Sequence, residues 1–110
     1  MSSVGMERII GMLGLAMRAG ELIVGTDMIC RAMAKKRPML VVISSGASAG
    51  TKKKLRTKCE FYSTESIEID LNTERLGHLL GKAYTPVAVA VTQAGIAEEI
   101  VKAHSALCKQ

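Results

Sequence analysis

Apolar residues recur every three or four positions near both ends of the chain, and this spacing predicts a helix at each end. Gly20 follows the first repeat, where a left-handed residue can stop a helix, so we expect the first helix to end there. The side chains expected in its core-facing stripe are Met6, Ile9, Ile10, Leu13 and Met17. The stripe expected on the terminal helix consists of Ile96, Ile100, Val101, His104 and Leu107.

Short apolar runs between these two helices predict four strands. Residues 21–25, 39–44 and 86–92 are largely apolar, which is typical of strands that are covered on both faces and indicates a mainly parallel sheet. Residues 66–71 instead alternate between apolar and acidic side chains. This alternation predicts a half-exposed strand near an edge of the sheet.

Three further helices are expected between the strands, over residues 26–36, 51–62 and about 72–81. Strands and helices therefore alternate with short connections, which predicts a single domain spanning 1–110 and folded as a three-layer α/β/α sandwich. The order of the strands stays open. The residues expected on the inner faces of these helices are Ile29, Ala32 and Met33, then Leu55, Cys59 and Tyr62, then Leu76, Leu79 and Leu80.

Positive charge is concentrated in the middle of the chain. Lys and Arg number 15 against 10 Asp and Glu, for a net charge of +5, and residues 28–59 contain nine of the cations and no acid. Such a stretch can form solvated helix faces, or it can bind phosphates with release of counterions. The absence of acids within it favours a polyanionic partner. Because the chain has three aromatic residues, too few for a stacking platform, structured RNA is favoured over single strands.

Motifs of enzymes, metal centres and membrane proteins are not found in the sequence. Its three cysteines are widely spaced, which fits reduced thiols, and it has neither a secretory signal nor an apolar run long enough to span a membrane. Loop 45–52 differs from a phosphate-binding loop, because its glycine spacing is one residue short and Lys52 follows Thr51. We therefore expect a cytoplasmic monomer with no cofactor, metal or catalytic residue, and a simple turn at this loop.

Four segments resemble those of a known family. They are LGLAMRAGELIVGTD at 13–27, SGASAGTKKKL at 45–55, LGHLLGK at 76–82 and VAVTQAGIAEEI at 89–100. In this order and at these separations, they resemble the bacterial branch of the kink-turn-binding ribosomal protein family. The resemblance covers nearly the whole chain, and it implies a small α/β/α sandwich with a four-stranded sheet of mixed direction and no catalytic activity.

The resemblance also implies an RNA-binding site built from two elements. One is the start of the helix after the first strand, and the other is the loop before the last strand. Basic residues nearby would add affinity that depends on salt. The partner implied is structured RNA, either a kink-turn or ribosomal RNA. The expected RNA-binding residues are Gly25, Thr26, Asp27, Met28, Arg31, Lys35, Lys36, Lys52, Lys82, Tyr84, Pro86 and Val87.

Three positions of this site differ from the family pattern. The best-known kink-turn binders carry Asn, then Glu, then a Lys three positions after that Glu, whereas this chain has Asp27, Met28 and Arg31. Arg31 can contact a guanine edge with bidentate geometry, but Met28 cannot accept a hydrogen bond from a guanine amino group. Two alternatives therefore stay open: a protein-interaction module that has lost base recognition, and a nucleotide-binding enzyme acting through residues 45–52.

Overall fold

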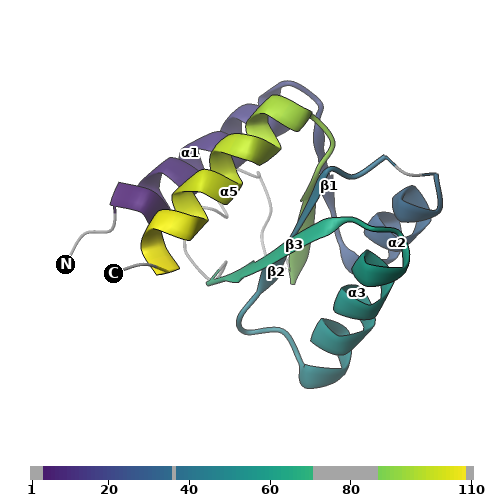
Figure 1. Ribbon diagram of the computed structural model, residues 1–110. Helices are drawn as coiled ribbons and strands as arrows, with labels where there is room; N and C mark the ends of the chain where they lie inside the picture. The colour runs from purple at the N-terminus through teal and green to yellow at the C-terminus, as the bar shows by residue number, and fades with distance from the viewer. Residues whose placement is uncertain (1–3, 36, 71–86, 109–110) are drawn as a thin grey trace.

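The computed structural model describes residues 4–35, 37–70 and 87–108. Helices and strands alternate along them as the hydrophobic pattern predicts, and the helix predicted over 72–81 lies outside the described residues (Figure 1). The elements are α1 (Val4–Arg18), β1 (Leu22–Val24), α2 (Thr26–Ala34), β2 (Leu40–Ser44), α3 (Ala49–Phe61), β3 (Glu65–Ile69), β4 (Ala88–Val91) and α5 (Ala94–Cys108).

The four strands form one mixed sheet in the order β1-β4-β2-β3. β4 is antiparallel to both of its neighbours, β1 and β2, and only β2 and β3 pair in parallel. The prediction of a mainly parallel sheet was therefore wrong, although the four-stranded mixed sheet implied by the family resemblance is confirmed. A continuous apolar run indicates that helices cover both faces of a strand. It does not indicate the direction of the strand, because burial is the same in either direction. β3 lies at an edge, as its alternating pattern predicted.

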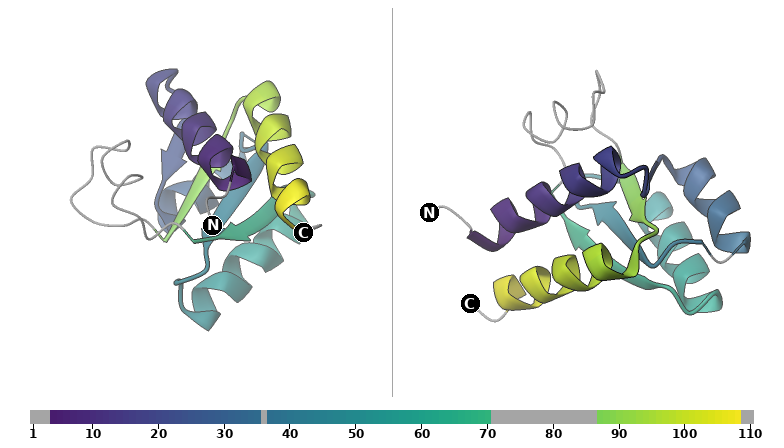
Figure 2. Two further views of the ribbon diagram at one scale, coloured as in Figure 1. Left: turned by 90° about the vertical axis from the view of Figure 1, so that its left-hand side faces the viewer. Right: turned by 90° about the horizontal axis from the view of Figure 1, so that it is seen from above.

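Two helical layers cover the sheet, and each has its own core (Figures 1 and 2). α1 and α5 lie side by side on one face, where Leu40 and Val42 of β2 point towards them. α2 and α3 cover the other face and pack on Val41 and Ile43. The three-layer α/β/α sandwich is thus confirmed. No helix among the described residues is both long and apolar enough to cross a membrane.

Among the described residues, the side chains of the predicted inner faces are buried or half-buried, with one exposed exception. Ile29, Ala32 and Met33 of α2 are buried, as are Leu55 and Cys59 of α3. In α1, by contrast, Met17 is 37% exposed although its spacing places it in the stripe. The buried residue in that last turn is Ala16.

The end of α1 follows the predicted left-handed stop. Gly20 has φ +73°, its N–H donates to the Met17 carbonyl, and the N–H of Glu21 reaches back to the Ala16 carbonyl at 2.8 Å. These two bonds satisfy carbonyls that the helix itself leaves open. The chain can then turn sharply into β1.

Candidate nucleic-acid interface

A glycine forms the turn between β1 and α2. Gly25 has φ +103° and ψ 141°, a backbone conformation that residues with a Cβ rarely adopt. Its N–H donates to the Ala88 carbonyl at 3.1 Å, and its own carbonyl accepts the N–H of Ile29. The turn is therefore held against the start of β4 while it begins the helix. No side chain of the described residues caps this N-terminus, so the first backbone donors of α2 are open to a ligand.

β1, β2 and β3 end at this edge of the sheet, and β4 begins there. Antiparallel pairing sets Val24, the last residue of β1, opposite Val89 of β4. Beside them, the Ser44 N–H at the end of β2 donates to the Val87 carbonyl, and the Ser45 N–H donates to the Ile69 carbonyl of β3, each at 2.8 Å. The start of α2 and Val87, the one described residue of the predicted RNA-binding loop, thus lie at the same edge. We call this edge the corner: Gly25, Thr26, Asp27, Met28 and Val87.

The corner exposes apolar side chains. Met28 is 53% exposed and Val87 43% exposed, and Asp27 is also exposed. Arg31 follows Asp27 by one helical turn and is exposed as well. Lys82, Tyr84 and Pro86, the other residues expected in this loop, lie outside the described residues. The surface combines open backbone donors, an exposed cation and apolar groups, which are the group types that hold phosphates and unstacked bases.

The basic residues predicted to assist the corner lie at different distances from it. Lys35 follows α2, a nine-residue helix about 14 Å long, so it lies a full helix length from Gly25. Lys36 lies outside the described residues. Lys52 is in the first turn of α3, which starts at the same edge of the sheet as the corner. Of the two described residues, Lys52 lies at the edge where α2 begins and Lys35 does not.

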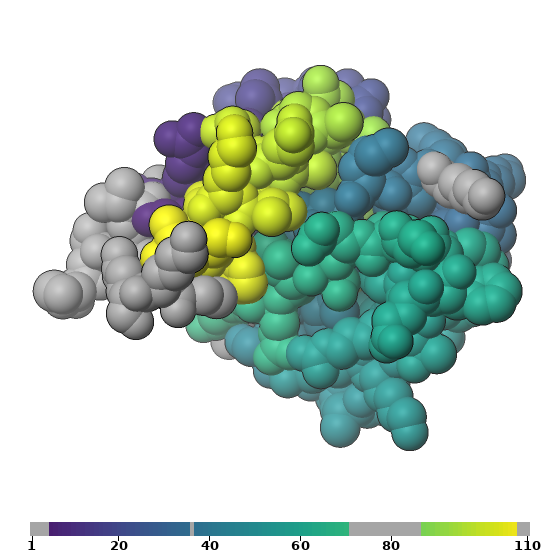
Figure 3. All heavy atoms as spheres, in the orientation of Figure 1, coloured from purple at the N-terminus to yellow at the C-terminus, as the bar shows by residue number. Residues whose placement is uncertain are grey.

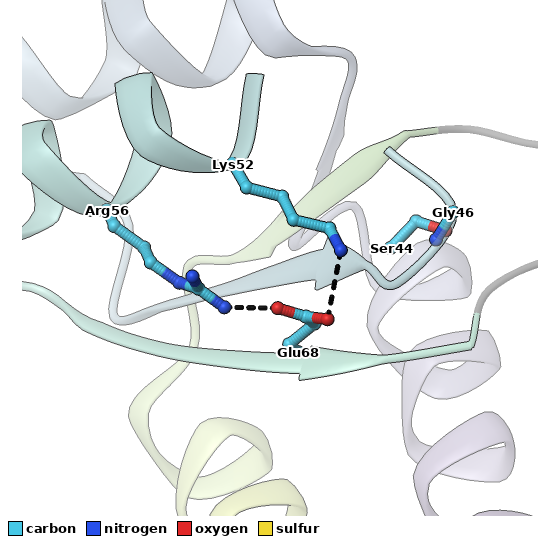
Figure 4. A network of polar contacts seen from close by, with 5 residues as sticks. All are labelled: Ser44, Gly46, Lys52, Arg56 and Glu68. Carbon is cyan, nitrogen blue, oxygen red and sulfur yellow. Dashed lines mark hydrogen bonds and ion pairs between the residues drawn. The ribbon is translucent and has the colours of Figure 1, made fainter. Parts of the chain in front are cut away.

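An acid on β3 neutralises part of the basic stretch (Figure 4). The Glu68 carboxylate contacts Lys52 Nζ at 3.2 Å through one oxygen and the Arg56 guanidinium through the other. Sequence reasoning missed this contact, because Glu68 lies outside the acid-free stretch and no local spacing relates it to α3. The expectation that these cations lack local acidic partners was therefore wrong for two of them. The acidic side of the alternating strand was the signal that could have revealed it.

The loop between β2 and α3 is closed by its own hydrogen bonds. Ser44 Oγ accepts the Gly46 N–H, and Ser48 Oγ accepts the Thr51 N–H, each at 3.2 Å. Ser48 is therefore the N-cap of α3, one turn before the position where the helix was predicted to begin. This geometry supports the simple turn expected here over a phosphate-binding loop.

Two cysteines lie in the core between α2, α3 and the sheet. Cys30 is half-buried, Cys59 is buried, and both are free thiols. Burial raises the pKa of Cys59 to about 11, above its ordinary value of 9.0. The thiol is therefore neutral at physiological pH and packs as an apolar side chain, as expected for reduced cysteines.

Relatives of known sequence match most of the chain. The RNA-binding protein YlxQ of Bacillus subtilis (strain 168) is 33% identical over 90 residues, which cover 82% of this chain and 88% of that protein. RNA-binding protein YlxQ of Enterococcus faecium is 30% identical over 76 residues, covering 69% and 73% of the two chains.

Solved structures with the same fold include two informative cases. A Bacillus halodurans protein, described as having unknown function, superposes with a TM-score of 0.79 and 32% identity, over 88% of this chain and 96% of that one. The Giardia lamblia 15.5kD RNA binding protein superposes with a TM-score of 0.78 over 96% and 92% of the two chains, but it is only 14% identical and supports the fold alone. A family model matches residues 7–101. The chain therefore belongs to the ribosomal protein L7Ae/L30e/S12e/Gadd45 family.

Proposed function

We propose that this protein binds structured RNA at the corner and is not an enzyme. The observation that carries the proposal is the bond between the Gly25 N–H and the Ala88 carbonyl, which sets the open N-terminus of α2 beside the start of β4, directly after the exposed Val87. The relatives from Bacillus subtilis and Enterococcus faecium are both named RNA-binding proteins, which supports an RNA ligand for this chain.

Residues of the corner and residues next to it have different chemical roles in this proposal. The backbone N–H groups around Gly25 and Thr26 donate to phosphate or to a base edge, and the positive end of the α2 dipole favours that contact. Arg31 contacts a guanine edge or a phosphate with its planar guanidinium. Val87, together with Tyr84 and Pro86 before it, packs on an exposed base.

The remaining cations add affinity without sequence preference. Lys35, Lys36 and Lys82 contact phosphates around the corner, and each neutralised phosphate releases counterions. Lys52 contributes in the same way only to the extent that RNA phosphate replaces its partner Glu68. Binding should therefore weaken steeply as salt increases from low to physiological concentration, and a flat response would contradict the mechanism.

Recognition of a kink-turn is the finer part of the proposal, with ribosomal RNA as one candidate partner. Asp27 offers acceptors only, and Met28 offers an apolar surface in place of the acceptor found in well-known kink-turn binders. We therefore expect a kink-turn preference that depends chiefly on Arg31 and on the shape of the corner.

A gel-shift titration tests both levels. A kink-turn RNA and a straightened control of the same length are titrated with the wild type, with Arg31→Ala and with Lys102→Ala, a matched cation on α5 on the other side of the sheet. Selective loss on the kinked RNA with Arg31→Ala indicates base readout. Equal loss on both RNAs indicates phosphate contact, and no binding of either RNA by the wild type refutes the proposal.

A protein-interaction module is the second candidate, and the exposed apolar side chains of Met28 and Val87 favour it. On this alternative the protein binds both RNAs weakly and equally, and Arg31→Ala has no more effect than Lys102→Ala. The same titration therefore separates the two functions.

A further inference from the structure

Four of the five cations of α3 lie in two pairs on different sides of the helix, and the pairs differ in their partners. Lys52 and Arg56, four residues apart, face β3 and share the Glu68 carboxylate. Lys54, Lys58 and Phe61 lie at positions i, i+4 and i+7 and so share another side of the helix. In the part of the chain that the structure describes, neither Lys54 nor Lys58 has an acidic partner. We call these three residues the α3 stripe.

The stripe ends in an unusually exposed aromatic ring. Phe61, the one phenylalanine of the chain, is 80% exposed, although such side chains normally bury most of their area. Its neighbour Tyr62 meets it edge-on, with the ring centroids 4.9 Å apart and the planes at 89°. Tyr62 is half-buried against the core and so supports the Phe61 ring from one side, leaving most of that ring open to a ligand.

A surface hollow lies beside this ring. Its volume is about 530 Å³, and its lining residues are Pro38, Met39, Phe61, Tyr62, Ser63 and Thr64. None of these side chains is acidic. Glu60 and Glu65, the acids nearest in sequence, line an adjoining hollow that shares Ser63 and Thr64 with this one.

Two cations stand next to the hollow on different segments. Arg37 directly precedes Pro38 and is exposed, and Lys58 lies one turn before Tyr62 on α3. The segment after α2 and the end of α3 thus line one hollow, with apolar side chains on both sides of it and one cation next to each segment. The α2 and α3 surfaces adjoin on one side of the molecule, away from α1 and α5 (Figure 3).

We propose that the α3 stripe is a second RNA contact, at which phosphates bind Lys54 and Lys58 and an unpaired base stacks on Phe61 over the hollow. The stripe is about 10 Å long, and Lys54 and Lys58 are about 6 Å apart along the helix axis, so two separate phosphates can each meet a cation. Stacking on an aromatic ring beside cations is the usual chemistry of single-stranded RNA recognition. This inference extends the proposed RNA binding from the corner to an unpaired segment that flanks the structured RNA.

A tryptophan reporter tests the contact directly. The chain has no Trp, so Phe61→Trp supplies a single indole that keeps a stacking surface. The variant is titrated with an oligoadenylate of about eight nucleotides, a length within the site sizes of single-strand binders. We expect saturable quenching of the indole fluorescence. Leu15→Trp, at an exposed apolar position on α1, is the matched control and should not be quenched.

Affinity measurements identify the groups involved. Phe61→Ala should weaken oligoadenylate binding by about ten-fold, because alanine substitution removes the stacked ring. Lys54→Gln with Lys58→Gln should lower the slope of log affinity against log salt by about 1.4, or 0.7 for each phosphate contact. Lys102→Gln, on α5, should leave that slope unchanged.

The outcomes separate this inference from the proposed function. If Arg31→Ala weakens kink-turn binding while Phe61→Trp shows no quenching with oligoadenylate, the stripe is not an RNA contact but the corner is. If Phe61→Trp is quenched, the quenching is unchanged when Arg31→Ala is added, and Phe61→Ala weakens oligoadenylate binding, then the stripe binds RNA independently of the corner. Binding of neither RNA by the wild type overturns both proposals.

Discussion

The two helical layers cover opposite faces of one sheet but carry different charge. On α1 and α5 the charges balance, since Arg8, Arg18 and Lys102 are matched in number by Glu7, Glu98 and Glu99. On α2, α3 and the segments next to them, cations outnumber acids. The described cations between residues 26 and 62 are Arg31, Lys35, Arg37, Lys52, Lys53, Lys54, Arg56 and Lys58, against the acids Asp27 and Glu60.

This contrast separates stability from binding. The α1–α5 layer is closely packed: a Cβ added at Gly5 would lie 2.9 Å from Leu107 Cγ. Two of its cations, Arg8 and Lys102, pair with Glu99 within the layer. The α2–α3 layer contains an equally apolar core but leaves cations and the Phe61 ring exposed, which costs self-repulsion and unburied apolar area in the free protein. A phosphate-bearing partner would relieve both costs, so the contrast predicts which substitutions affect folding and which affect RNA.

The largest expected effect is on the packed layer. Leu13→Ala removes a fully buried side chain of α1 and should lower the free energy of unfolding by about 2–5 kcal/mol, as measured by urea denaturation. RNA affinity, measured under conditions in which the variant is still folded, should not change. Arg31→Ala should weaken RNA binding but change the free energy of unfolding by less than about 0.5 kcal/mol. Loss of RNA binding by folded Leu13→Ala would contradict the separation.

A substitution in the turn at the corner should affect both stability and RNA binding. Gly25→Ala places a Cβ on a residue with φ +103°, which should cost about 1–3 kcal/mol of stability and weaken RNA binding through the displaced α2 N-terminus. An added methyl meets no atom within 4 Å at this position, so backbone strain is the cause. Gly11→Ala, on α1 and equally open, is the matched control. It should stabilise the protein by about 0.5–1 kcal/mol and leave RNA binding unchanged.

Release of the neutralised cations should strengthen binding moderately. Glu68→Gln frees Lys52 and Arg56, so the slope of log affinity against log salt should steepen by up to about 0.9 for each cation that then meets a phosphate. Glu99→Gln frees Arg8 and Lys102 on the opposite layer and should not alter the slope. Equal effects of the two variants would show that RNA responds to net charge alone.

The smallest expected effect is the pH dependence of the α1–α5 ion pair. The Arg8 guanidinium, with Lys102 nearby, holds the pKa of Glu99 below its ordinary value of 4.5. Because the folded-state pKa is the lower one, the stabilisation is complete above about pH 4.5 and is lost as pH falls through the lowered pKa. The difference in urea midpoint between wild type and Glu99→Gln should therefore be present at pH 7 and disappear in acid. A difference that persists there would show that Glu99 stabilises by packing.

Much of the local structure followed from the sequence. The spacing of Ile29, Ala32 and Met33 identified the buried side of α2, and the alternation around Ile67 and Ile69 identified an edge strand. These patterns succeed because helical and extended backbones repeat with different periods, so each strip of apolar residues reports its own burial. The prediction that Met17 is buried was wrong, because the spacing identifies one side of α1 along its whole length. It does not show how far the neighbouring elements cover the last turn of that helix.

The sequence by itself determined the elements, their buried sides, the left-handed stop at Gly20 and a basic middle of the chain. Only the tertiary structure decided which distant segments meet. Insertion of β4 between β1 and β2 sets Gly25 against Ala88, and parallel pairing of β3 beside β2 brings Glu68 to Lys52. The physical reason is that hydrophobic periodicity records only whether a residue is buried. Strand order depends on the packing of the whole sheet. It places Glu68 beside Lys52 and Arg56, and it leaves Lys54 and Lys58 on another side of α3 without an acidic partner among the described residues.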